Sequence, residues 1–149
     1  METAADALIS KTPITVVAFE TTGLTAGPDR VVEIGVTRVD PDGGCTLVLD
    51  TLVNPERPVG ATEIHGITDR DVRAAPTFGE IAPDLVSVLS GTVVTAFNVY
   101  FDIRFLQAEL SRVGLRSQPP HLCLMYLRPL LDLGPKAGLA RTCEELGLN

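Results

Sequence analysis

VVAFETTGL, residues 16–24, is an apolar run that ends in one carboxylate, which two threonines and a glycine follow. Because side chains alternate between the faces of a strand, Ala18 and Glu20 share one face, and Val17 and Phe19 share the other. An acid at position 18 would stand beside Glu20, and carboxylates paired in this way can hold two divalent ions roughly 3.5 to 4 Å apart. Position 18 is alanine, so only Glu20 remains for that chemistry. The alternative is that Glu20 simply ends the strand in solvent.

The elements around this strand alternate in type. The turn DPDGG at 40–44 joins two strand-like runs into a hairpin, so the sheet is expected to begin as an antiparallel meander of three strands. A helix, a fourth strand and another helix follow, and this order implies a right-handed crossover that places the fourth strand beside the meander. We therefore predict an α/β fold, a mixed sheet flanked by helices. The expected strands are 14–19, 31–39, 45–53 and 91–97; the expected helices are 78–89 after a Thr77 cap, one that follows Asn98, 122–131 and 137–146; and 54–72 is expected to be a surface excursion with short helical pieces.

Length and composition limit the functional classes. With 149 residues, 45% of them hydrophobic, the chain predicts a single domain at 14–149, preceded by an extension at 1–13. Its longest apolar stretches fall well short of the roughly 18 residues that a membrane span requires, so no membrane partner is expected. The net charge of −7 argues against binding long nucleic acid through a basic surface. An enzyme that binds terminal nucleotides through metal ions takes its positive charge from the metal, so the net negative charge of the chain does not exclude such an enzyme.

The cysteines and the N-terminal stretch favour a cytoplasmic location. Cys45, Cys123 and Cys143 are widely separated and contain no CxxC pair, which indicates reduced thiols rather than a disulfide framework or a zinc site. METAADALISKTP, residues 1–13, carries two acids and lacks both the basic leader and the long apolar block of a secretory signal.

A second group of candidates lies in TAFNVYFDIRFL, residues 95–106. If Asn98 caps the helix, Asp102 lies one turn later on the same side, with Phe101 next to it. An acid in the first turn is also simply favourable to the helix dipole, which is the alternative explanation for Asp102. Since Glu20 ends one strand and Asp102 begins the helix after the fourth, adjacent strand ends would bring the two carboxylates into one crevice.

The histidines are a third group. His65 lies in EIHGIT, residues 63–68, and a lone histidine in a loop is more often structural or solvated than catalytic. The same holds for His121.

These segments together resemble a known family. FETTGL, then NPERPVGATEIHGITDRDVRAAPTF, then AFNVYFDIRFL keep the order and spacing of three segments of the DEDD exonucleases, specifically the DnaQ-like group that includes the proofreading epsilon subunit of bacterial DNA polymerase III. The resemblance runs from about residue 14 to the C-terminus. It implies a ribonuclease H-like fold and 3′-to-5′ hydrolysis of single-stranded nucleic acid by two Mg²⁺ or Mn²⁺ ions.

The resemblance assigns roles position by position. The first motif of the family, Asp-x-Glu-Thr-Thr-Gly, aligns with Glu20 but places Ala18 where its first acid belongs. The second motif aligns Asp102 as a metal ligand, although the residue before its asparagine is often histidine and is Phe97 here. By resemblance Glu20 and Asp102 are the metal-binding and catalytic residues. The positions expected to contact the terminal nucleotide are Thr21, Thr22, Gly23, Leu24, His65, Gly66, Ile67, Asn98 and Phe101; ordinary core packing is the alternative for Leu24, Ile67 and Phe101.

The third motif of the family, a histidine followed five residues later by an aspartate, would be expected after ARTCEELGLN, and the sequence stops before it. His121 comes too early in the chain to be its general base. With two of four acids and no base, the chain is expected to be inactive, or nearly so, as a nuclease. Two hypotheses remain open: a 3′-to-5′ exonuclease domain disabled by Ala18 and truncated before its third motif, or a non-catalytic module. Such a module would bind the 3′ end of single-stranded DNA or RNA, or a protein partner such as a polymerase or repair subunit.

Overall fold

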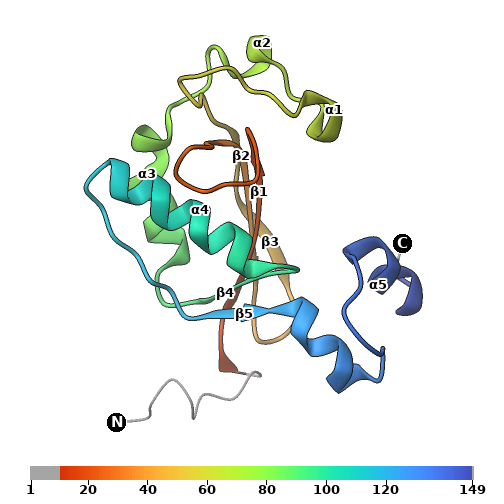
Figure 1. Cartoon of the computed structure of the whole chain (residues 1–149). Coiled ribbons are helices and arrows are strands. Elements are labelled where there is room, and N and C mark those ends of the chain that lie inside the picture. Colours follow the sequence, from red (N-terminus) through yellow and green to blue (C-terminus); the bar gives the residue numbers. More distant parts are fainter. Residues whose placement is uncertain (1–10, 149) are drawn as a thin grey trace.

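Five strands form one mixed sheet at the centre of the protein, in the order β3-β2-β1-β4-β5 (Figure 1). The structure is a computed structural model that describes residues 11–148, so most of the predicted extension at 1–13 lies outside the described residues. The predicted mixed sheet flanked by helices is confirmed. The strands are β1 (Ile14–Thr21), β2 (Val31–Val39), β3 (Cys45–Leu52), β4 (Val93–Ala96) and β5 (His121–Cys123); the helices are α1 (Thr62–His65), α2 (Asp69–Val72), α3 (Phe78–Leu89), α4 (Val99–Arg112), the 3₁₀ helix η3 (Leu124–Leu131) and α5 (Leu139–Glu145).

Strands β1, β2 and β3 form the predicted antiparallel meander. The turn between β2 and β3 closes through Asp40, whose N–H donates to the carbonyl of Gly44 at 2.8 Å. Gly43 occupies the left-handed region at φ 88°, which a residue with a side chain adopts only at a cost. The turn chemistry of DPDGG thus sets the β2–β3 register, in which Val39 pairs with Cys45. In the neighbouring β1–β2 pair, Ala18 lies opposite Gly35 and Glu20 opposite Glu33.

The core lies between one face of the sheet and helices α3 and α4. Val17 and Phe19 of β1 point into this core, as their alternation with Ala18 and Glu20 predicts. Helix α3 begins with a capping box in which the Thr77 hydroxyl and N–H both donate to Glu80. The predicted cap is therefore present, and it fixes where α3 begins to cover the sheet.

One prediction for the C-terminal third was wrong at its start. The helix expected at 122–131 is present as the 3₁₀ helix η3 over 124–131, but residues 122 and 123 belong to a short strand, β5. Pro119 and Pro120 favour extended backbone before β5, and β4 offers it a parallel partner, since the Thr95 hydroxyl donates to the carbonyl of Leu122 at 2.6 Å. A short apolar run can form a strand or a helix, and here the unpaired edge of β4 favours the strand. The second predicted helix, 137–146, is present as α5.

The opposite face of the sheet is only partly covered. Ala18 is exposed on this face, although β1 is the central strand of the sheet. Leu124 of η3 and Leu139 of α5 border a hollow above it, and Figure 1 shows η3 and α5 apart from the α3 and α4 layer. None of the helices within residues 11–148 is long and apolar enough to cross a membrane.

A buried arginine holds α5 against η3. Arg128 of η3 is 2% exposed and donates to the carbonyls of Leu133 and Pro135, to the Thr142 hydroxyl and to Glu145. All four acceptors lie within residues 133–145, so the guanidinium holds α5 and the loop before it against η3.

Candidate active site

Ala18, Glu20 and Asp102 lie where the end of β1 meets the start of α4. Strand β4 runs parallel to β1 and ends at Ala96, so α4 begins beside the last residues of β1. The Asp102 side chain is 8% exposed, and its Oδ1 accepts the N–H of Phe19 at 3.2 Å. A hollow of about 370 Å³ lies between the two elements and has Ala18, Asn98, Phe101 and Asp102 in its wall.

The two candidate carboxylates interact electrostatically. Burial raises the pKa of Asp102 from 3.8 to about 6; hydrogen bonds from the N–H of Phe19 and from its own N–H act against this, and the nearby charge of Glu20 adds to it. Within residues 11–148, Asp102 forms no ion pair with any arginine or lysine. Asp102 is therefore a buried acid whose charge is stabilised by backbone N–H donors and opposed by a neighbouring carboxylate.

These side chains do not fit a pair of divalent ions as they stand. No group of three or more His, Cys, Asp or Glu side chains that could hold a metal ion occurs in the described part of the chain. Hard cations such as Mg²⁺ and Mn²⁺ prefer several oxygen ligands, and Glu20 and Asp102 are only two. Ala18 lies in the wall of the same hollow as Asp102, where its methyl group supplies no ligand.

Leu24 and Phe101, two predicted nucleotide contacts, lie together in the structure. Leu24 is 83% exposed and shares with Phe101 and Arg104 a hollow of about 310 Å³. Phe101 also lines the hollow of Asp102, and its ring lies 4.8 Å from that of Phe105. Phe101 therefore lies between the hollow beside Leu24, called here the Leu24 niche, and the hollow of Asp102.

The preceding residues of the loop, Thr21 to Gly23, have structural contacts instead. The Thr21 hydroxyl donates to the carbonyl of Gly23 at 2.7 Å, and the Thr22 hydroxyl donates to Asp29 at 3.3 Å. A Cβ on Gly23 would lie 2.4 Å from Oδ2 of Asp29, so this close approach requires glycine. Asp29 thus fixes the conformation of the loop that carries Leu24.

His65, Gly66 and Ile67 border neither of these hollows. Nδ1 of His65 accepts the N–H of Ile67 at 3.1 Å, and its Nε2 is buried without a partner within the described residues. Ile67 is 8% exposed and packs in a small cluster with Val32, Val59 and Val72. The segment therefore lies outside the walls of both hollows, and Ile67 packs in a small core cluster.

Asn98 and two residues outside the predicted set complete the surroundings. Asn98 is the residue before α4, but its side chain makes no capping hydrogen bond; it is exposed and borders the Asp102 hollow. Glu33 stands opposite Glu20 in the β1–β2 register, and residues so paired share one face of the sheet. His121 lies on β5 in a separate hollow, which also includes Asn98.

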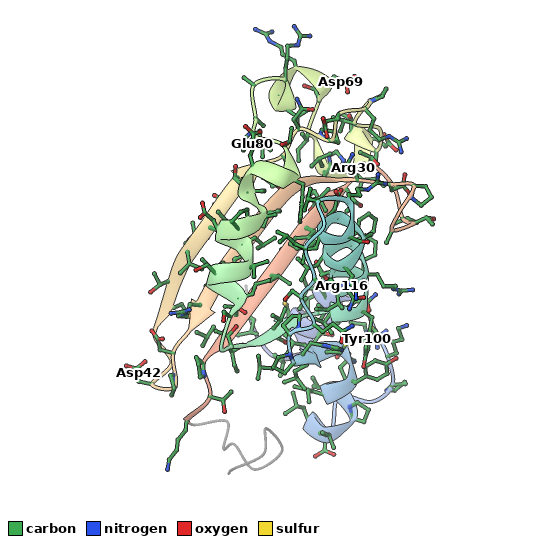
Figure 2. All side chains as sticks on the ribbon, turned by 90° about the vertical axis from the view of Figure 1, so that its left-hand side faces the viewer. Arg30, Asp42, Asp69, Glu80, Tyr100 and Arg116 are labelled. Carbon is green, nitrogen blue, oxygen red and sulfur yellow. The ribbon has the colours of Figure 1, made fainter. Side chains whose placement is uncertain are left out.

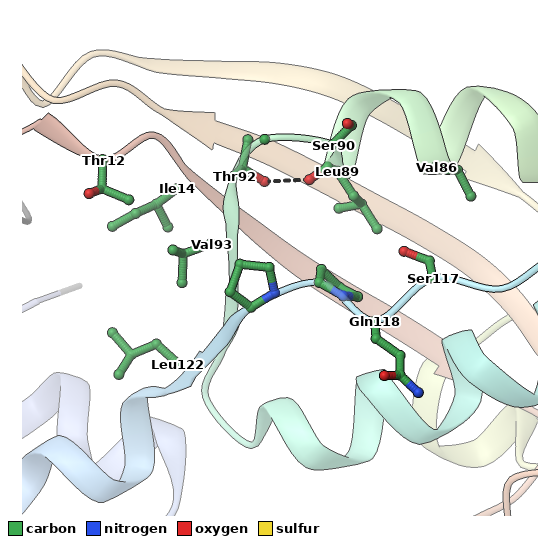
Figure 3. A pocket seen from close by; sticks show the side chains of 13 residues that line it. Thr12, Ile14, Val86, Leu89, Ser90, Thr92, Val93, Ser117, Gln118 and Leu122 are labelled. Carbon is green, nitrogen blue, oxygen red and sulfur yellow. Dashed lines mark hydrogen bonds between the residues drawn. The ribbon is translucent and has the colours of Figure 1, made fainter. Parts of the chain in front are cut away.

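A larger apolar hollow of about 500 Å³ lies at the other end of β1 and β4 (Figure 3). Ile14, Val93 and Leu122 contribute to it, and Thr92 donates its hydroxyl hydrogen to the carbonyl of Leu89 at its rim. None of the described residues that line it is titratable. Sites in open α/β sheets form at the carboxyl ends of parallel strands, and this hollow lies at the amino ends, so the Asp102 hollow is the better candidate.

Comparison with known proteins adds a family match. Residues 16–149 match the family model described as exonuclease, RNase T type. Over 146 residues the chain is 30% identical to the PolC-type DNA polymerase III of Thermotoga petrophila. This alignment covers 96% of the chain and 11% of the relative. Over 94 residues it is 43% identical to the epsilon subunit of DNA polymerase III from Treponema pallidum. This second alignment covers 62% of the chain and 43% of the relative.

The fold has a solved counterpart. The structure of exonuclease I from E. coli in complex with a dA16 oligonucleotide superposes with a TM-score of 0.79 at 17% identity, over 93% of this chain and 36% of that one. The chain thus spans less than half the length of each of these three proteins.

Proposed function

The chain belongs to the exonuclease family whose model spans residues 16–149, and from this premise we propose that residues 14–149 act as one 3′-to-5′ exonuclease-type domain that binds the 3′ end of single-stranded nucleic acid and is catalytically disabled. One observation carries the proposal. Asp102 and Ala18, which has no oxygen to offer a metal ion, line the same hollow, and Glu20 lies close enough to raise the pKa of Asp102.

The side chains around the hollow suit the end of a strand. Leu24 and Phe101 offer apolar contact to a terminal base or sugar, which needs no sequence readout. Glu20 and Asp102 are the oxygen ligands available to Mg²⁺ or Mn²⁺, but a third carboxylate is missing at position 18. Two-metal hydrolysis therefore lacks part of its ion site.

A second function is supported by the same alanine. A module that has lost a ligand at position 18 can still bind a nucleic-acid end, or can hold a polymerase or repair subunit as its partner. The relatives named as a PolC-type DNA polymerase III and as the epsilon subunit of DNA polymerase III support such a partner. The three cysteines are free thiols, which fits the reducing cytoplasm as the location for either function.

Restoring the missing carboxylate tests the proposal. We expect Ala18→Asp to tighten Mn²⁺ binding by at least about tenfold in titration calorimetry, since even outer-shell partners of metal ligands are worth about 10- to 100-fold in affinity. Ala18→Asn, of similar size without charge, and Leu47→Asp, an acid at an exposed position of β3, are the matched controls and should leave Mn²⁺ affinity unchanged.

The parent chain should show no turnover of a single-stranded 3′ end with Mg²⁺ or Mn²⁺. Metal-dependent turnover that Glu20→Ala abolishes would contradict the proposed disablement. An Ala18→Asp variant that binds Mn²⁺ no better than the parent would contradict the assignment of the ion site and favour the binding module.

A further inference from the structure

The hollow of His121, of about 570 Å³, lies on the other side of the first turn of α4 and has several aromatic rings in its wall. The ring of Tyr100 meets that of His121 edge to face at 5.6 Å and that of Tyr126 at 6.0 Å. Tyr100 and Tyr126 are 44% and 61% exposed, so their rings are not core packing. Figure 2 shows Tyr100 at the start of α4, beside the C-terminal segment.

The charged side chains of this hollow are all basic. Arg104 of α4 and Lys136, which precedes α5, contribute to its wall, and no aspartate or glutamate does so among the described residues. Arg30, Arg57, Arg112, Arg128 and Arg141 are paired with acids. Within residues 11–148, neither Arg104 nor Lys136 has such a partner. In a chain with a net charge of −7, two unpaired cations beside three exposed rings are a local departure from the overall charge.

The three hollows around α4 are adjacent to one another. Asn98 belongs to both the aromatic hollow and the Asp102 hollow. Arg104 belongs to both the aromatic hollow and the Leu24 niche. A chain of nucleotides that has its last residue at Leu24 and Phe101 can therefore reach the aromatic hollow without crossing the sheet.

We propose that Tyr100, His121 and Tyr126 form a stacking platform for a second, internal base of a single strand, and that Arg104 and Lys136 bind the adjoining phosphates. This inference rests on the proposed binding of a strand end. Exposed aromatic faces combined with cations are the means by which proteins hold single strands without reading sequence. A duplex does not fit this platform, because its bases are already stacked within the helix.

Equilibrium binding of a fluorescein-labelled dT8 strand to the full chain, in low salt with EDTA, tests the platform. We expect Tyr126→Ala to weaken binding about tenfold, the loss typical when one stacked base loses its aromatic partner. Tyr126→Phe keeps the stacking face and should bind as the parent does. Leu130→Ala is the matched control, since Leu130 is an exposed side chain of the same helix that is not part of the hollow.

The phosphate contact has its own readout. Lys136→Gln should reduce the slope of log affinity against log salt by about 0.7, the value for one phosphate contact on a single strand. Arg70→Gln removes an exposed arginine on α2 and should leave the slope unchanged. Because Lys136 is exposed, this arm holds even if Tyr126→Ala perturbs η3.

The outcomes separate this inference from the proposed function. If the parent binds dT8 and Tyr126→Ala binds it equally well, the platform is wrong and the proposed end binding stands. If the parent binds no dT8, both are wrong. If free dTMP displaces dT8 at equal concentration, the hollow is a mononucleotide site and the strand platform is overturned.

Discussion

Two buried acids of α4 each accept a backbone N–H, but only one of them is paired with an arginine. Asp102 accepts the N–H of Phe19 at 3.2 Å, and Glu109, two turns later on the same face, accepts the N–H of Val31 at 3.0 Å. Glu109 also accepts the Arg30 guanidinium at 2.7 Å, whereas Asp102 has no such partner within residues 11–148.

The difference separates an acid that holds the fold from an acid that is open to a ligand. The charge of Glu109 is compensated inside the protein, and its hydrogen bond raises the pKa of Arg30. The charge of Asp102 is not compensated, and burial raises its pKa to about 6. Figure 2 shows Arg30 and Tyr100 at opposite ends of α4, so the two environments belong to the two ends of one helix. Perturbed acids beside a hollow are typical of functional sites, while paired acids are typical of structural ones.

Removing the structural acid should have the largest effect. We expect Glu109→Ala to lower the free energy of unfolding by about 3 to 5 kcal/mol, because it leaves the Arg30 charge without its main partner and the Val31 N–H without an acceptor. Urea denaturation at pH 7 measures this loss, and Asp102→Asn, a change to the other buried acid of the same helix, should show no loss. A loss of less than about 1 kcal/mol, the value of an exposed ion pair, would remove the distinction between the two acids.

The pH dependence of stability should identify Asp102. Since its pKa in the folded protein, about 6, lies above the ordinary value of 3.8, the folded state binds the proton more tightly than the unfolded state does. Stability contributed by the protonated form is therefore present below about pH 4 and is lost as the pH rises through 6. At pH 8 the uncharged Asp102→Asn variant should be more stable than the parent by on the order of 2 to 3 kcal/mol, and near pH 4 the two should be equal.

The difference in stability between the parent and Asp102→Asn isolates the contribution of Asp102. Asp71, Glu80 and Glu145 have a lowered pKa because they accept hydrogen bonds in the folded state, so their contribution runs the opposite way and is lost as the pH falls. They are present in both proteins and cancel in the comparison. A stability difference that does not change between pH 4 and 8 would show that the Asp102 environment is no more costly to the charge than water.

The sequence predicted the fold well where local patterns act alone. The alternation in residues 16–20 gave the two faces of β1, and the turn at 40–44 gave the meander. The nearness of Glu20 to Asp102 could be expected because β4 was expected to lie beside the meander, and the end of β1 then meets the start of α4.

What the sequence could not give depends on partners distant in the chain. Strand β5 needs the edge of β4, which no local pattern reveals. Thr22 turns toward Asp29 rather than toward the hollow, because a carboxylate seven residues later accepts its hydroxyl. The distinction between Asp102 and Glu109 rests on Arg30, which is 79 residues from Glu109 in the sequence.

Divalent ions give the smallest and most selective test of the comparison. Two carboxylates bind Mg²⁺ weakly, so at a concentration equal to the dissociation constant the stabilisation is about 0.4 kcal/mol. For a chain of this length such a gain corresponds to a Tm higher by roughly 1 °C. At pH 8 we expect the parent to show this rise and Asp102→Asn to lose it, because the uncharged amide is a poorer ligand. Glu109→Gln should keep the rise, since the Glu109 carboxylate is buried and paired with Arg30 in the parent. If Asp102→Asn shows the same rise as the parent, the ion acts on the general negative charge of the protein, and the buried acid of α4 is not its ligand.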